Sequence, residues 1–369
     1  METSYQYITN SKIQPFTEIN GKNYLYFAGT GYFQLQSHPL VVEAAVAATR
    51  QYGIGSATSR SVNGTTPLII KLEQKIARFF RTDDAAYLPS GYLSNLAAFQ
   101  ALDTMGLYDV LFIDEEAHYS NTSGALATGK KVIPFRHLNP DDLMTKIRKT
   151  LKINEKPLIV SDGLFPIQAE IAPIPEYLQI AQKYNGLVWV DDAHGVGILG
   201  KEGRGVYEHF QLDDDRLFMG ATLSKAFGAY GGFITGNQSF IDAVKAGHVM
   251  TGTNSPPAAL AGAGLKGIEM VENNPGFLIK LRENALYLKE NLRQAGLKIK
   301  PDDLPIVTIT TGEAGQMEKI QQNMMKDGIY IQYIHYIGSG DQGVLRMVVS
   351  SEHTKDQINL LVHSLMKYL

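Results

Sequence analysis

The sequence predicts an α/β fold in which a large domain with a mostly parallel β-sheet precedes a smaller α+β domain. From about residue 39 to 236, short apolar runs alternate with stretches of helical periodicity. The runs are rich in β-branched and aromatic residues, as expected of a parallel sheet that is buried on both faces. From about residue 276 the pattern changes to one long amphipathic helix followed by further strands and helices. We therefore place an N-terminal hairpin segment at 1–34, the large domain at 35–265 and the small domain at 266–369.

Local signals predict the individual elements. Two apolar runs, 12–19 and 23–29, flank Asn20-Gly21, a dipeptide typical of a tight β-hairpin turn. Segments 39–53 and 67–80 have helical periodicity, and Pro67 suits the first turn of the second helix. The predicted strands of the large sheet are 85–89, 109–114, 131–135, 157–163, 186–192, 216–222 and 231–236. In the small domain we expect a helix at 278–296 and strands at 305–311, 329–336 and 344–350.

The composition excludes several classes of function. The chain of 369 residues contains no cysteine, which rules out disulfides, thiol nucleophiles and cysteine-bound metals. A hydrophobic share of 44% and a charged share of 19% are those of a globular protein. The net charge of -3 gives no reason to expect nucleic acid or an anionic membrane as a partner. We expect a cytoplasmic protein, because the start lacks a signal-peptide pattern and no apolar run approaches the ~20 residues of a membrane span.

Polar side chains follow several of the predicted strands. Because ligands of open parallel sheets bind at the carboxyl ends of the strands, we expect these side chains to converge. No phosphate-binding GxxxxGK[ST] or GxGxxG pattern follows an early strand, which argues against a nucleotide site. The converging residues are Ser90, Gly91, Tyr92, His118, Asp162, Asp191, His194, Thr222, Ser224 and Lys225.

Lys225 and Asp191 suggest a specific chemistry. Lys225 lies between an apolar strand and the glycine-rich segment 226–232, and Asp191 ends the preceding predicted strand. Such a pair suits pyridoxal 5'-phosphate (PLP), which forms a Schiff base with a lysine and needs a carboxylate to keep its ring nitrogen protonated. A solvated lysine and a helix-capping aspartate fit the residue types equally well, so both interpretations remain open at this point.

Several longer motifs resemble the α-oxoamine synthase family of PLP-dependent enzymes. They occur in the family's order from about residue 24 to the C-terminus. This resemblance implies the fold type I, or aspartate aminotransferase-like, architecture and PLP as the cofactor. The most specific stretches are LPSGYLSNLAA, DEEAHYSNTSGA, VWVDDAHGVGILGKEGRGVYEHF, GATLSKAFGAYGGF, TNSPPAA and LRMVVSSEHT.

The resemblance also implies roles for single residues. Lys225 matches the Schiff-base lysine and the base that acts on the α-carbon of the substrate. Asp191 matches the partner of the pyridine nitrogen. His118 matches the histidine stacked on the pyridine ring, and His194 matches the hydrogen-bond partner of the cofactor's phenolic oxygen.

Further matches concern the phosphate and the substrate. Gly91 and Tyr92 match a helix-start turn that binds the phosphate, and Thr222 matches a phosphate-binding hydroxyl. Thr253 matches a hydroxyl that reaches the phosphate of the partner subunit, so the family implies a homodimer. Arg346 matches the arginine that binds the substrate carboxylate, a task suited to a planar guanidinium.

Three positions depart from the family pattern, and all three lie on the substrate side. Gly31 stands where the family has an asparagine, Ile69 where it has a histidine, and Pro166 where it has a serine. These departures leave the acyl donor and the amino acid open.

The resemblance implies a decarboxylative condensation of an amino acid with an acyl-CoA. Within the family, we favour the 8-amino-7-oxononanoate synthase branch, which serves biotin synthesis, over the 2-amino-3-ketobutyrate CoA ligase branch and other α-oxoamine synthases. A PLP-dependent aminotransferase or aldolase is an alternative of another class. A non-catalytic subunit is a further alternative, motivated by Gly31 and Pro166.

Overall fold

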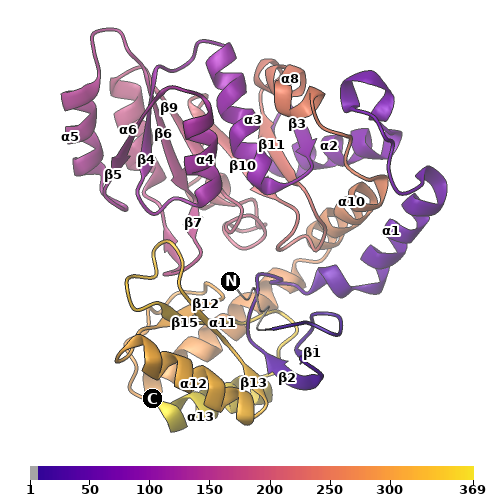
Figure 1. Cartoon of the computed structure of the whole chain (residues 1–369), viewed down its shortest axis with the longest axis vertical. Coiled ribbons are helices and arrows are strands. Elements are labelled where there is room, and N and C mark those ends of the chain that lie inside the picture. The colour runs from indigo at the N-terminus through magenta and orange to yellow at the C-terminus, as the bar shows by residue number, and fades with distance from the viewer. Residues whose placement is uncertain (1–6) are drawn as a thin grey trace, which may run out of the picture. The chain divides into compact units, whose positions relative to one another are not determined.

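The computed structural model describes residues 7–369, which divide into two compact units (Figure 1). Unit 1 contains the described residues up to His38, the short segment Pro166–Ala169 and the C-terminal part Asn274–Leu369. Unit 2 contains Pro39–Phe165 and Glu170–Asn273. The domain limits predicted at residues 34 and 265 remain a prediction.

Unit 2 is built on a seven-stranded sheet with the order β3-β11-β10-β9-β6-β4-β5. Every neighbouring pair from β10 to β5 is parallel, whereas β11 runs antiparallel to both of its neighbours. The mostly parallel sheet predicted from the alternating pattern is therefore confirmed. Its strands are β3 (Asp84–Leu88), β4 (Val110–Asp114), β5 (Lys131–Phe135), β6 (Pro157–Asp162), β9 (Leu187–Asp191), β10 (Leu217–Thr222) and β11 (Gly232–Gly236).

Several helices of unit 2 pack on this sheet, and a short hairpin of β7 (Leu164–Phe165) and β8 (Glu170–Ile171) follows β6. Helix α3 begins directly after β3, because Ser90 caps it by accepting a hydrogen bond from the backbone N–H of Leu93. The helices are α1 (Pro39–Tyr52), α2 (Pro67–Phe80), α3 (Gly91–Thr104), α4 (Tyr119–Ala127), α5 (Pro140–Thr150), α6 (Ile174–Lys183), α7 (Val206–His209), α8 (Gln238–Ala246), α9 (His248–Thr251) and α10 (Ala258–Asn273). A single π-helical turn, η2, spans Arg60–Gly64.

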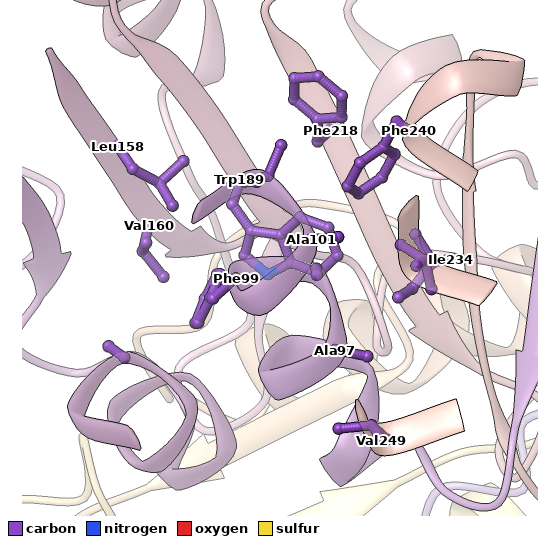
Figure 2. Close-up of a cluster of buried hydrophobic side chains, with 14 of the residues drawn as sticks. Ala97, Phe99, Ala101, Leu158, Val160, Trp189, Phe218, Ile234, Phe240 and Val249 are labelled. Atoms are coloured by element: carbon purple, nitrogen blue, oxygen red, sulfur yellow. The ribbon is translucent and has the colours of Figure 1, made fainter. Parts of the chain in front are cut away.

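Trp189 on β9 lies at the centre of a hydrophobic core of unit 2 (Figure 2). Its indole ring packs edge-on against Phe99 of α3, with the ring centroids 5.7 Å apart. Side chains from β6, β10, β11 and α8 surround this pair, among them Val160, Phe218 and Ile234. The core therefore fixes α3 against the strands whose ends carry the predicted site residues.

Unit 1 contains two three-stranded sheets. The predicted hairpin is present as β1 (Phe16–Ile19) and β2 (Lys22–Tyr26), joined by Asn20 and Gly21, which both have positive φ as a tight hairpin turn requires. The remaining elements are η1 (Leu35–Ser37), α11 (Gly276–Gln294), β12 (Ile306–Ile309), α12 (Ala314–Lys326), β13 (Ile329–Tyr330), β14 (Gln332–Ile334), β15 (Val344–Val348) and α13 (Lys355–Tyr368).

The single strand predicted at 329–336 is instead two short strands in different sheets. β13 pairs in parallel with β2 of the hairpin, whereas β14 pairs antiparallel with β15. Ile331 lies between them and is fully buried. The continuous apolar pattern predicts extended backbone correctly, but it does not specify which sheet each half joins.

Within residues 7–369, none of the helices is both long enough and apolar enough to cross a lipid bilayer.

Candidate active site

A cavity of about 230 Å³ lies in unit 2 at the carboxyl ends of β6, β9 and β10. These three strands are neighbours in the sheet, so the residues at their ends are brought side by side. The starts of α3 and α4 complete the wall. The structure thus brings together seven of the nine predicted site residues: Gly91, Tyr92, His118, Asp191, His194, Thr222 and Lys225.

One end of the cavity is suited to an anion. The first residues of α3, Gly91 and Tyr92, present backbone N–H groups at a helix N-terminus. Thr222 lies opposite, and its hydroxyl contacts that of Ser224 at 2.8 Å. A Cβ at position 91 would come within 3.0 Å of the Thr222 Cβ, so glycine allows the helix start to approach this hydroxyl closely.

Asp191 is held in place by a chain of hydrogen bonds that leads back to the buried indole of Trp189. Its Oδ2 accepts a bond from Asn95 Nδ2 at 2.8 Å, and its Oδ1 accepts one from the backbone N–H of Ala193 at 3.2 Å. Asn95 is oriented in turn because its Oδ1 accepts a bond from Trp189 Nε1 at 2.9 Å. The hydrophobic core therefore determines where the Asp191 carboxylate points.

His118 caps α4 and forms part of the cavity wall. Its Nδ1 accepts a hydrogen bond from the backbone N–H of Ser120 at 3.1 Å and lies 2.6 Å from the Ser120 hydroxyl. Burial lowers the pKa of His118; the nearby charge of Asp191 opposes this effect and that of Lys225 adds to it. A neutral imidazole held in one orientation offers a flat face to an aromatic ligand.

Lys225 follows β10 in a turn that buried apolar neighbours fix. Leu223, Ala226 and Phe227 are all fully buried. The turn is closed by a hydrogen bond from the backbone N–H of Ala229 to the carbonyl of Leu223 at 2.9 Å. These buried residues fix the turn, and Lys225 within it lines the cavity.

Arg346 belongs to unit 1, where it lies on β15 and is only 4% exposed. Its Nε donates to the carbonyl of Pro166 at 2.9 Å, and its Nη1 donates to the carbonyl of Gly29 and to Gln332 Oε1. Its Nη2 is buried without a hydrogen-bond partner among the described residues. A buried guanidinium with a free donor is suited to an anionic ligand.

The remaining predicted residue, Thr253, lies in unit 2 but not among the residues that line the cavity. Its hydroxyl donates to the carbonyl of Val249 at 2.7 Å. Ile69, one of the three departures, is fully buried in α2.

Sequence reasoning missed three contributors to the site. Asn95 lies near the start of α3, where a polar residue resembles a surface position, and only the fold reveals that it is buried and bonded to Asp191. Ser120 contacts both His118 and Asn95. Tyr230 lines the cavity and is 53% exposed. Ser120 and Tyr230 lie within the quoted motifs, close to the predicted residues His118 and Lys225, which is the only signal that the sequence offers for them.

Comparisons with known proteins agree with this geometry. Residues 28–365 match the aminotransferase class I and II family. An 8-amino-7-oxononanoate synthase of Bacillus velezensis is 33% identical over 352 residues, which cover 95% of this chain and 89% of the relative. A serine palmitoyltransferase of Sphingobacterium spiritivorum is 31% identical and covers 95% of this chain and 87% of the relative.

Solved structures point in the same direction. A serine palmitoyltransferase from S. paucimobilis with a bound PLP–myriocin aldimine superposes with a TM-score of 0.91 at 25% identity, covering 98% of this chain and 92% of that structure. An 8-amino-7-oxononanoate synthase from Francisella tularensis shares the fold with a TM-score of 0.78 at 22% identity, covering 93% of this chain and 97% of that structure.

The residues of the cavity fit PLP. The helix start at Gly91 and the hydroxyl of Thr222 suit a phosphate dianion, Asp191 is a fixed carboxylate, and Lys225 supplies an amine. The comparisons confirm the predicted cofactor, the fold type I class and the class of PLP-dependent acyltransferases. This chain belongs to the aminotransferase class I and II family and, as its motifs predict, to the α-oxoamine synthases within it.

Proposed function

We propose that this protein condenses an amino acid with an acyl thioester, with loss of CO2, as an 8-amino-7-oxononanoate synthase does. The single observation that carries the proposal is the convergence of Lys225, Asp191 and His118 with an anion-binding helix start in one cavity. Relatives of that name at 31–33% identity over most of the chain support this branch of the family.

The name of the product suggests the substrates. A nine-carbon chain with an amino group at carbon 8 and a ketone at carbon 7 is alanine, without its carboxyl group, joined to a seven-carbon dicarboxylic acyl group. We therefore propose alanine and a seven-carbon dicarboxylic acyl-CoA as the first pair to test.

Each residue of the site has a defined task in this proposal. Bound PLP supplies an electron sink for the bond that breaks at the α-carbon of the amino acid. Lys225 holds the cofactor and moves the α-proton, Asp191 keeps the proton on the ring nitrogen, and the imidazole of His118 fixes the plane of the ring. His194 binds the phenolic oxygen of the cofactor.

The phosphate and the substrate carboxylate are bound by the other residues. The backbone N–H groups of Gly91 and Tyr92 and the hydroxyl of Thr222 hold the phosphate. Arg346 binds the carboxylate of the amino acid. The buried Nη2 of Arg346, which lacks a partner among residues 7–369, supports this role.

A second candidate is a serine palmitoyltransferase-like reaction. The relative from Sphingobacterium spiritivorum supports it, since its identity of 31% is close to the 33% of the first relative. The two candidates share the cofactor and the bond-forming step, and they differ in the amino acid and in the length and charge of the acyl chain.

Thiol release on mixing amino acids with acyl-CoAs tests both candidates. The purified holoenzyme is incubated with alanine, serine or glycine and with acetyl-CoA, a seven-carbon dicarboxylic acyl-CoA or palmitoyl-CoA. Free CoA in stoichiometric amounts with alanine and the dicarboxylic thioester supports the first proposal, and release with serine and palmitoyl-CoA supports the second.

The same experiment separates the other classes of function. Formation of a keto acid from the amino acid without thiol release indicates an aminotransferase. Absence of the imine absorption band of protein-bound PLP, recorded after free PLP is removed, indicates a non-catalytic subunit. If no pair releases thiol although PLP binds, the condensation is wrong and the cofactor assignment stands.

Replacing Arg346 should affect the amino acid far more than the acyl donor. Arg346→Lys keeps a positive charge but loses the planar fork, so we expect KM for the amino acid to rise about tenfold or more. KM for the acyl-CoA should change little. Arg293→Lys, at an exposed ion pair on α11, is the matched control and should leave both constants unchanged. An equal rise in both constants for Arg346→Lys would contradict the proposed role.

We also propose a cytoplasmic homodimer in which Thr253 reaches the phosphate in the partner subunit. The segment that carries Thr253 is held by two contacts to the loop before α2, a β-bridge between Ser59 and Asn254 and a hydrogen bond from Ser255 N to the carbonyl of Thr58. This loop also bears Val62, whose side chain is 75% exposed. Sedimentation at micromolar concentration tests the proposal, and a monomer that binds PLP with full affinity would contradict it.

A further inference from the structure

A second carboxyl group lies beside Asp191 at the same edge of the sheet. Strands β6 and β9 are neighbours in the sheet (Figure 1). Asp162 ends β6 as Asp191 ends β9, and the two residues are direct partners in the parallel register. Partner residues of adjacent parallel strands project toward the same side of the sheet. Asp162 is 2% exposed and lines the cavity, yet the proposed reaction assigns it no task.

The bonds of Asp162 tie it to the start of α4. Its Oδ1 accepts a hydrogen bond from the backbone N–H of His118 at 3.1 Å and another from Asn121 Nδ2 at 2.9 Å. His118 is the N-cap of α4, and Asn121 lies in its first turn and is fully buried. Two of the bonds that anchor the segment carrying the imidazole therefore end on one oxygen of Asp162.

The charged groups around Asp162 determine its protonation. Burial raises its pKa well above the usual range, and the negative charge of Asp191 raises it further. Asp114, at the end of β4, acts in the same direction, whereas the N–H of His118 and the charge of Lys225 oppose them. Two adjacent carboxyl groups do not ionise together readily in such surroundings. Because Asp191 must carry the negative charge beside the ring nitrogen, Asp162 is the member that remains neutral.

We propose that Asp162 is a positioning residue of this site, a neutral carboxylic acid that holds His118 and the first turn of α4 against the cofactor plane. It thus places the ring that contacts the cofactor without adding a second negative charge beside Asp191. The inference rests on the cofactor and on the proposed stacking of His118, and it is independent of which acyl donor the enzyme uses.

Two substitutions separate the shape of the side chain from its charge. Asn is a neutral group of the same size, and its amide oxygen can accept both bonds, so Asp162→Asn should keep the affinity for PLP within about threefold of the wild type. Asp162→Ala removes both bonds, so the affinity should fall about tenfold or more. The visible circular dichroism of the bound cofactor should also be weakened, because the ring of His118 is no longer held in one place.

The pH dependence of the visible absorption band gives a second readout, which a merely structural role would not affect. The band of the cofactor joined to Lys225 reports the proton on that nitrogen. If Asp162 is neutral, the pH midpoint of this band in Asp162→Asn should coincide with that of the wild type. If Asp162 is ionised, replacing it by Asn removes a negative charge near Lys225 and lowers the midpoint by about one unit or more, which would overturn the proposal.

The matched control is Asp114→Ala, since Asp114 is a buried carboxyl at the corresponding end of β4 that does not line the cavity. Its thermal stability should fall, while the dichroism of bound PLP should stay near that of the wild type. An equal loss of dichroism in Asp114→Ala and Asp162→Ala would overturn the proposal, and so would unchanged binding in Asp162→Ala. Failure of the wild type to bind PLP would instead refute the proposed function.

Discussion

Lys225→Ala should abolish condensation while leaving a folded protein that still binds PLP. The variant lacks the amine that joins the cofactor and moves the α-proton, two tasks that no other side chain lining the cavity in residues 7–369 performs in the proposed reaction. We expect kcat to fall by about 10³-fold or more. The rate of CoA release, measured with the amino acid that the wild type uses fastest, gives kcat for both proteins.

A chemical measurement accompanies the kinetic one. Borohydride reduces the C=N bond between a lysine and PLP, and it should fix the cofactor on the peptide that contains Lys225 in the wild type but not in Lys225→Ala. Lys201→Ala, in an exposed turn after the cavity loop, is the control and should keep both the label and the activity. Labelling of any other lysine in the wild type would contradict the assignment.

Asp191→Asn should give the second largest loss. The substitution keeps the size of the side chain and removes the charge that holds a proton on the ring nitrogen, so the cofactor becomes a weaker electron sink. We expect the exchange of the α-hydrogen of the amino acid with deuterium oxide to slow by about 10²- to 10³-fold. This exchange requires no acyl donor, so it measures the role of Asp191 separately from the choice of thioester.

Two further variants sharpen this test. Asp191→Glu retains the charge and should recover part of the exchange rate. Asp114→Asn, at the end of β4, should not slow the exchange, because this carboxyl does not line the cavity. If Asp191→Asn exchanged the α-hydrogen at the rate of the wild type, the ring nitrogen would need no carboxylate and the proposed role would be wrong.

The edge of the sheet that holds this chemistry could be predicted from the sequence, because a parallel strand is a short apolar run and the polar residue after it marks the carboxyl end. Asp191 and Thr222 end such runs, and the structure places them at neighbouring strand ends. The motif order then selected Lys225 and His118 among other polar residues. The sequence also predicted Asp162 as a polar residue at a strand end. It did not indicate that Asp162 and Asp191 are register partners on neighbouring strands.

Other features depend on contacts between distant segments and therefore had no local signal. Asn95 is one of several polar residues in α3, and its bonds to Asp191 and Trp189 join residues more than 90 positions apart. The division of 329–336 between two sheets has the same cause, since β13 pairs with β2 near the N-terminus. Periodicity describes which face of an element is apolar, but the partner is chosen by tertiary packing.

The side chain of Gln36 limits which residues position 31 can hold. A Cβ at position 31 would lie 2.7 Å from Gln36 Nε2, so the amide of Gln36 occupies the volume that a side chain there would need. Displacing this amide would break its hydrogen bonds to Gln34 Oε1 and to the carbonyl of Ile13. A side chain at position 31 therefore requires the amide of Gln36 to move and give up these bonds, so substitutions at 31 and 36 should have non-additive effects on stability.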